Sequence, residues 1–175
     1  MTRGWLGDQN NGGGDPDDSD REGSDQTPAP VRPGRLVIVG ESNPYHQDPR
    51  FALYHLPRQA SGNRLRKHLG LTDATYWSLA KVNLCSGKWN LAEARATAEG
   101  IIKLYDSAIL LGAKVRKAFD GPEPFSVAVR AGCYLVGLPH PSGLNRAWSA
   151  PGARARARYV LETAIPWTPW GETGA

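Results

Sequence analysis

The sequence predicts an α/β protein, in which helices cover both faces of a central, mainly parallel sheet of four strands in a three-layer α/β/α arrangement. Two observations predict this class: the order of strand-like and helix-like segments, and the length and hydrophobic content of the chain. Short aliphatic and β-branched runs alternate along the chain with longer segments of helical periodicity. Strands separated by helices pair in parallel, and the connecting helices bury both faces of the sheet. The 175 residues, 40% of them hydrophobic, suffice for one such domain.

The first elements follow from short local patterns. Residues 36–39 are a β-branched run of strand length that ends at Gly40. A long loop continues through Ser61. Residues 63–69 then place two leucines on one face of a short helix, which stops at Gly70.

The remaining elements continue the alternation of strand and helix. Asn90 is a residue type that accepts hydrogen bonds from the free N–H groups at a helix start. We expect strands over residues 79–84, 106–111 and 134–138, and helices over 91–105, 113–119 and 152–164.

The chain is expected to have three parts: a disordered acidic tail over residues 1–34, one domain over 35–166, and a C-terminal tail over 167–175. The first part is rich in Gly, Asp and Ser, and its three arginines and seven acidic residues give a net charge of −4. The remainder holds 18 basic and 10 acidic residues, a net charge of +8. A basic body suits a polyanionic partner.

Several kinds of site and location are not expected. The chain has neither an apolar stretch of the roughly 18 residues that cross a membrane nor the apolar centre of a signal peptide. We therefore expect no membrane association and a cytoplasmic location. Cys85 and Cys133 are too few for a four-cysteine iron–sulfur cluster, and the four histidines lack zinc-binding spacing. The sequence thus predicts no metal, no cofactor and a monomer.

Two loops carry the residues with chemical potential. Residues 40–46, Gly-Glu-Ser-Asn-Pro-Tyr-His, directly follow the first predicted strand. Residues 138–146, Leu-Pro-His-Pro-Ser-Gly-Leu-Asn-Arg, run from the end of the fourth strand. In parallel α/β sheets, sites form beyond the carboxyl ends of the strands, so we expect both loops at one edge.

These loops resemble the two motifs of the uracil-DNA glycosylase superfamily, GQDPYH, GINPG or GEAPG for the first and HPSPLS or NPSGLSR for the second. Residues 62–65 are similar to its Gly-Arg-Leu-Leu helix start, and residues 82–84 to the strand end that carries its base-reading asparagine. The resemblance covers roughly residues 35–165. It implies a uracil-DNA glycosylase-like fold and a DNA glycosylase of base-excision repair. Such an enzyme would hydrolyse the N-glycosidic bond of uracil, or of a related modified pyrimidine, flipped out of DNA.

The resemblance also implies catalytic roles. Breaking the bond leaves a cationic sugar and an anionic pyrimidine, so preorganised donors and a placed water are needed. His140 would donate a hydrogen bond to the developing anion at O2 of the base. Asn43 would position the water, but the chain has one more residue after Gly40 than the family patterns. Glu41 matches the glutamate of GEAPG, and the role is therefore split between Asn43 and Glu41.

Other loop residues are expected to contact the DNA. Tyr45 would exclude a methyl group at C5 of the base, and Asn83 would read its pairing edge. Leu144 would enter the duplex as a wedge, although a leucine in such a loop also suits a core anchor. Further predicted substrate-binding residues are Ser42, Ser142, Gly143, Asn145 and Arg146, with Ser142 and the backbone of Gly143 gripping phosphates.

The aromatic that stacks on the base in the family is displaced in this chain. Counting back from Gly62 reaches Pro57, with Tyr54 and Phe51 further upstream. The pocket walls are therefore altered, which leaves a larger modified pyrimidine open as the substrate.

Two other functions are open. Residues 40–44 nearly fit G-x-S-x-G, which would make Ser42 the nucleophile and His140 the base of a serine hydrolase. Pro44 replaces the final glycine, however, where that turn needs close backbone approach. The third possibility is a non-catalytic module that binds DNA or a protein on the same fold.

Overall fold

One five-stranded sheet organises the part of the chain that the computed structural model describes, residues 34–42, 52–54, 60–168 and 170. All of them belong to one compact unit, Val31–Ala175. The strand order is β2-β1-β3-β5-β4. The strands are β1 (Leu36–Ser42), β2 (Ala80–Cys85), β3 (Ser107–Leu111), β4 (Ser126–Arg130) and β5 (Cys133–Leu138).

The α/β class and the mainly parallel sheet are confirmed, because β2, β1, β3 and β5 pair in parallel. The predicted number of four strands is wrong. The additional strand, β4, pairs antiparallel with β5. Its five residues follow a proline-rich loop, and it joins β5 through a two-residue turn, Ala131 (φ 47°) and Gly132 (φ 82°). Positive φ at both central residues is typical of the tight hairpin turns that match strand twist.

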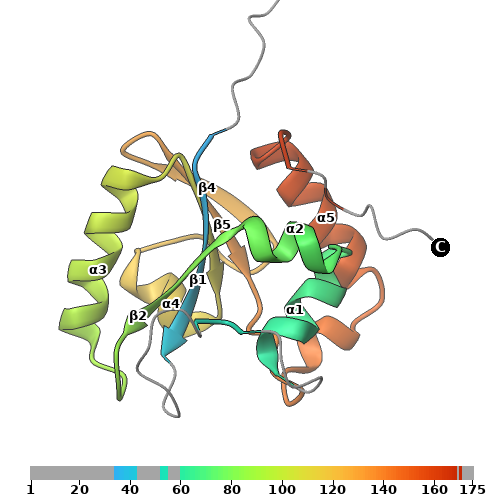
Figure 1. Ribbon diagram of the computed structural model, residues 1–175, viewed down its shortest axis with the longest axis horizontal. Coiled ribbons are helices and arrows are strands. Elements are labelled where there is room, and N and C mark those ends of the chain that lie inside the picture. The colour runs from blue at the N-terminus through green and yellow to red at the C-terminus, as the bar shows by residue number, and fades with distance from the viewer. Residues whose placement is uncertain (1–33, 43–51, 55–59, 169, 171–175) are drawn as a thin grey trace, which may run out of the picture. The chain divides into compact units, whose positions relative to one another are not determined.

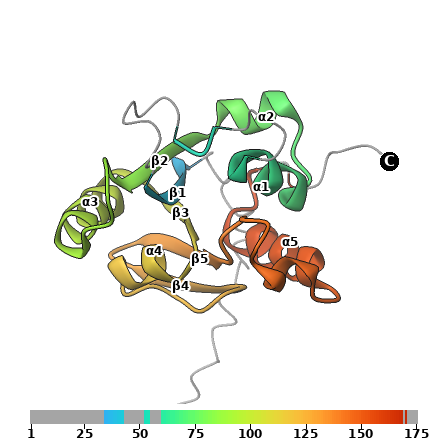
Figure 2. The same ribbon diagram turned by 90° about the horizontal axis from the view of Figure 1, so that it is seen from below.

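Helices lie on both faces of the sheet, which is consistent with a three-layer arrangement (Figures 1 and 2). The four predicted helices are present, and two short elements were not predicted, α2 and the 3₁₀ helix η2. The helices are α1 (Ser61–Leu69), α2 (Asp73–Ser78), α3 (Leu91–Leu104), α4 (Ala113–Ala118), η2 (Arg146–Ser149) and α5 (Ala153–Ala164).

Alternation along β1 divides the core in two. Leu36 and Ile38 join the cluster beneath α1, α2 and α5, whereas Val37 and Val39 join the cluster beneath α3 and α4. All four side chains are buried because each face of the strand is covered by helices. The loops that connect strands and helices therefore lie at the two ends of the strands.

The last described residues pack on the domain. Trp167 lies against the first of these clusters, and Trp170 is 5% exposed with its indole N–H donating to the carbonyl of Ile165 at 3.0 Å. Residues beyond the expected domain end at 166 therefore contribute to the core.

None of the described helices is long and apolar enough to cross a bilayer. Within the same residues, no three His, Cys, Asp or Glu side chains are grouped so that they could hold a metal ion. Cys85 and Cys133 are free thiols in the core. Burial, together with the charge of Asp106, raises the pKa of Cys133 to about 11, so this thiol stays protonated at neutral pH.

Candidate functional site

The carboxyl edge of the sheet brings the described parts of both loops together. Since β1 pairs with β2 and β3, and β3 with β5, the ends of these strands lie next to one another. Figure 2 views the molecule from this edge. Glu41 is the penultimate residue of β1, Gly112 directly follows β3 and His140 lies two residues past β5. The predicted meeting of the two loops at one edge is confirmed for these residues.

The imidazole of His140 is half-buried and held in one protonation form. Its Nδ1 accepts a hydrogen bond from the backbone N–H of Ser142 at 3.2 Å. An Nδ1 that accepts leaves the proton of the neutral ring on Nε2, which is therefore a donor. Burial lowers the pKa of His140, and the nearby charge of Glu41 partly offsets this shift. The ring is thus a neutral donor near pH 7.

Gly112 makes room for His140. A Cβ atom on Gly112 would lie 3.1 Å from the Cβ of His140, closer than side chains normally approach. The backbone of Gly112 also has φ +91°, a region that favours glycine. The histidine can therefore lie directly against the end of β3.

Glu41 is held by an ion pair. Side chains alternate along β1, so Glu41 lies on the α3–α4 side, opposite Gly40. The Nζ of Lys114 donates to its carboxylate, and the same ammonium lies 5.6 Å from the centre of the Trp89 ring. The carboxylate is thereby fixed close to His140.

Asn83 lies on β2 opposite Gly40, its register partner on β1. A Cβ at Gly40 would lie 2.5 Å from Oδ1 of Asn83 and 3.2 Å from the side chain of Leu53. Glycine thus gives the amide its space. Among the described residues the half-buried amide of Asn83 has no hydrogen-bond partner. A half-buried amide without partners is unfavourable unless water or a ligand satisfies it.

The second loop is a fixed tip that points Leu144 into solvent. The backbone N–H of Asn145 donates to the carbonyl of Ser142 at 3.1 Å, and the side chain of Asn145 caps η2 by accepting from Ala147 N at 3.0 Å. Leu144 is 95% exposed, so the interpretation as a core anchor is wrong. The core anchor of this loop is Trp148, whose indole N–H donates to the carbonyl of Pro139 at 3.1 Å.

The predicted site residues differ in how far the structure describes them. Ser42 is half-buried at the end of β1, Ser142 is half-buried, and Arg146 is exposed. Asn43 and Tyr45 lie outside the described residues, as do two of the three candidate stacking positions, Phe51 and Pro57.

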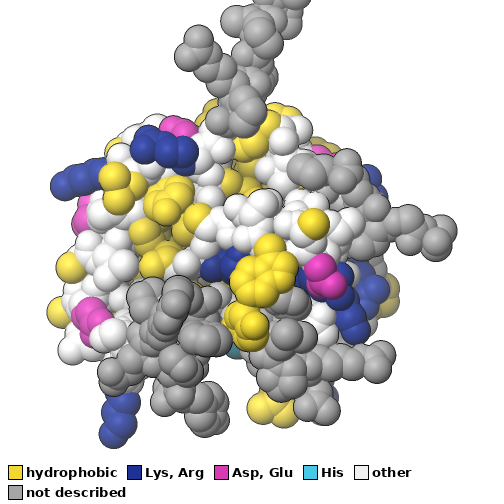
Figure 3. All heavy atoms as spheres, in the orientation of Figure 1, with side chains coloured by type: hydrophobic (Ala, Val, Ile, Leu, Met, Phe, Trp, Pro, Cys, Tyr) yellow, Lys and Arg dark blue, Asp and Glu magenta, His cyan; other side chains and the backbone are white. Residues whose placement is uncertain are grey.

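Tyr54 is the candidate stacking position that the structure describes. It packs edge-on against Trp77 of α2 with ring centres 5.3 Å apart. Hydrophobic side chains are exposed on this face next to α2 (Figure 3), and Trp77 has 47% of its surface exposed. Two further aromatic rings therefore lie on the side of β2 that carries Asn83.

Sequence reasoning missed the residues that support the site. Gly112 and Lys114 lie just past the third predicted strand, at the edge where the site was expected. This position in the sequence could have identified them as residues of the site. Arg64 was noted only as part of a helix start, yet it lies against Gly143 of the second loop. This contact joins segments about eighty residues apart, and no local pattern predicts it.

Comparisons with protein-family models, with curated proteins and with solved structures give no match for this chain.

Proposed function

We propose that this chain is a DNA glycosylase that hydrolyses the N-glycosidic bond of uracil, or of a related modified pyrimidine, flipped out of DNA, on a uracil-DNA glycosylase-like fold. One observation carries the proposal. At a single edge of the sheet, a neutral imidazole that donates from Nε2 lies with a fully exposed leucine and with an amide that has no partner among the described residues. The two loop motifs supply the chemical interpretation of that arrangement.

His140 fits the demand of the bond-breaking step. Negative charge develops on the departing base, and a donor aimed at it strengthens its hydrogen bond only as the charge forms. The backbone N–H of Ser142 fixes the tautomer, so no proton rearrangement is needed before reaction. Partial burial increases the strength of such a bond because water competes less.

Asn83 supplies a base-reading amide. Uracil presents an N3–H donor and an O4 acceptor on its pairing edge, and one amide can satisfy both. Cytosine presents the opposite pattern. The Oδ1 of Asn83 lies close to Gly40, in space that a side chain at position 40 would fill.

The position of the water is split between two residues. Glu41 is held near His140 and would also counter the positive charge of the sugar, whereas Asn43 holds the place that the motif assigns to this role. Glu41→Gln and Asn43→Ala are to be compared in single-turnover cleavage and in melting temperature. We expect the water-positioning residue to be the one whose loss slows the chemical step without lowering the melting temperature.

The geometry of His140 opposes the serine hydrolase. A histidine base needs a free lone pair on the nitrogen that faces the serine, with the other nitrogen donating to an orienting group. Here Nδ1 accepts and Nε2 carries the proton, the reverse arrangement. Ser42 therefore lacks a base in this conformation.

The test is cleavage of a substrate panel with His140→Ala as the control. Oligonucleotides containing uracil, thymine, hypoxanthine, xanthine or 5-hydroxymethyluracil are incubated with excess protein in single and double strands, then treated with alkali. We expect cleavage at uracil or 5-hydroxymethyluracil by the natural chain and strong loss in the variant. Tight DNA binding with no cleavage of any base would instead support the non-catalytic module.

A further inference from the structure

We propose that Arg64 and Arg154 form a phosphodiester-binding site at the base of the second loop, between α1 and α5. The inference rests on the proposed function for the source of the phosphate, a nucleic-acid strand that passes Leu144. It adds two residues from separate helices to the expected contacts of Ser142, Gly143 and Arg146.

The first observation is the contact between Arg64 and the loop. A side chain at Gly143 would collide with the guanidinium of Arg64, since its Cβ would lie 2.8 Å from Cζ and closer still to Nη1. The guanidinium therefore lies directly on the backbone that leads to Leu144. A strand that reaches the tip of this loop necessarily comes near Arg64.

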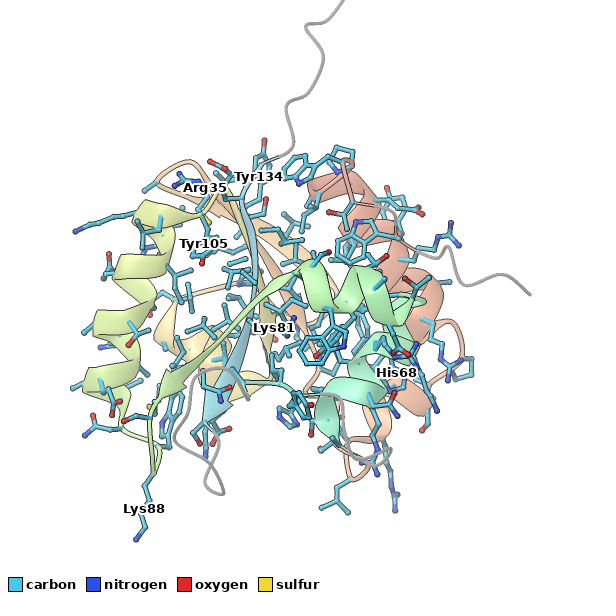
Figure 4. All side chains as sticks on the ribbon, in the orientation of Figure 1. Arg35, His68, Lys81, Lys88, Tyr105 and Tyr134 are labelled. Atoms are coloured by element: carbon cyan, nitrogen blue, oxygen red, sulfur yellow. The ribbon has the colours of Figure 1, made fainter. Side chains whose placement is uncertain are left out.

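The second observation is the clustering of charge around His68. This residue lies on α1 where the helix meets α5 (Figure 4), and its ring stacks on Trp148 at 4.3 Å. Burial lowers the pKa of His68, and the positive charges of Arg154 and then Arg64 lower it further. Because α1 packs against α5, one arginine on each helix adds positive charge around the same imidazole.

The third observation is that these two arginines have no counterion among the described residues. Six other arginines of the described part pair with carboxylates within 4.0 Å, namely Arg35, Arg66, Arg95, Arg116, Arg130 and Arg158. Within the same residues, neither Arg64 nor Arg154 has a carboxylate at that distance or a side-chain hydrogen bond. Like charges brought together without an acid are unfavourable, and a bound anion relieves this.

The three arginines of α5 differ in their partners. Arg156 lies over the ring of Phe125 at 4.8 Å, and Arg158 pairs with Glu162 one turn further along. Arg154 alone of the three has neither a carboxylate nor an aromatic ring as a partner among the described residues, and its charge acts on His68. A guanidinium binds a phosphate through two parallel N–H groups, which suits two arginines converging on one phosphodiester.

The test measures how salt weakens binding of a fluorescent single-stranded oligonucleotide. Log affinity falls as log salt rises. Loss of one phosphate contact reduces the magnitude of this negative slope by about 0.7 for single strands. Because the two arginines share one phosphodiester, we expect Arg64→Gln and Arg154→Gln each to reduce the magnitude of the slope, by up to about 0.7. The matched controls, Arg158→Gln on the same helix and Arg95→Gln on α3, should leave it unchanged, and melting temperatures verify folding.

A second readout identifies the ligand. The imidazole resonances of His68 are followed while the natural chain is titrated with the oligonucleotide and, separately, with inorganic phosphate. We expect a shift with micromolar oligonucleotide that disappears in Arg64→Gln. A shift with millimolar inorganic phosphate and none with the oligonucleotide would overturn the assignment to a nucleic-acid strand.

Different results would overturn the phosphodiester site and the glycosylase. Uracil cleavage by the natural chain with unchanged salt slopes in both arginine variants would overturn the phosphodiester site and leave the glycosylase. Reduced slopes in a chain that cleaves no base would overturn the glycosylase and leave the site.

Discussion

At the scale of single residues, the chemistry of the candidate site depends on neighbours that lack side chains. Gly112 lets His140 lie against the end of β3, and Gly40 leaves space for the amide of Asn83. A methyl group at either glycine would press on the functional side chain. The close approach of the histidine to β3 and the space around the amide therefore come from contacts between segments distant in the sequence, whereas the tautomer of the histidine is fixed locally by Ser142.

The role of His140 is tested by truncation. We expect His140→Ala to lower single-turnover cleavage by about 10²–10³, the typical cost of losing one preorganised donor. DNA binding should change little, because the bond to the base strengthens only in the transition state. Cleavage is measured by rapid quenching and binding by fluorescence anisotropy. Full activity in the variant would remove His140 from the mechanism.

Base choice is tested at Asn83. In Asn83→Asp a carboxylate would repel O4 of uracil and accept from the amino group of cytosine, so uracil excision should fall strongly and weak cytosine excision should appear. Cleavage rates of uracil- and cytosine-containing oligonucleotides give the ratio.

Asn83→Ala is the control for that ratio. It removes the reading group without adding charge and should lower uracil excision with no gain for cytosine. A shifted melting temperature in Asn83→Asp with an unchanged ratio would show that Asn83 has only a structural role.

At the scale of elements, the second loop is a short tip on a firm base. Trp148 fixes the base through its hydrogen bond to Pro139 and its stacking on His68, while Asn145 orders the turn by capping η2. Leu144 takes no part in this packing, being 95% exposed. A rigid mount lets an apolar side chain enter a base stack without first being ordered.

The wedge is therefore tested by Leu144→Ala. Unstacking costs a few kcal/mol only where a stack exists, so the variant should cleave paired substrate much more slowly and single strands almost normally. The melting temperature should not change, because the side chain buries almost nothing. Equal losses on both substrates would contradict the wedge.

At the scale of the whole molecule, two half-buried histidines link stability to pH. Burial lowers the pKa of both His68 and His140 below the ordinary value of 6.5. The unfolded chain then binds more protons than the folded one as the pH falls through about 6.5. The free energy of unfolding therefore keeps its full value above this pH and declines below it.

This linkage is measured by chemical denaturation at pH 7.5 and pH 5.5. We expect a lower free energy of unfolding at pH 5.5 and a smaller decline in His68→Phe. Phenylalanine keeps a ring against Trp148 but has nothing to protonate, and it removes a buried Nδ1 that has no described partner. An identical decline in the variant and the natural chain would exclude His68 as a source of the pH dependence.

Local sequence patterns predict the alternation of strands and helices and the edge of the sheet at which the two loops meet. Both follow from local periodicity, because a strand of four aliphatic residues and an amphipathic helix reveal their buried faces without reference to the rest of the chain. The strand β4 escaped this reasoning since its valines at 127 and 129 are exposed and its pairing depends on β5.

The chemical state of the site, in contrast, depends on the folded chain. The space around the amide of Asn83 and the exposure of Leu144 depend on how distant segments pack. The proton on Nε2 of His140 depends on the turn in which the backbone N–H of Ser142 donates to Nδ1. The pairing of charges likewise depends on the folded chain. The sequence gives the number of arginines, but their distances to carboxylates depend on packing. Among the described residues, Arg64 and Arg154 have no carboxylate partner.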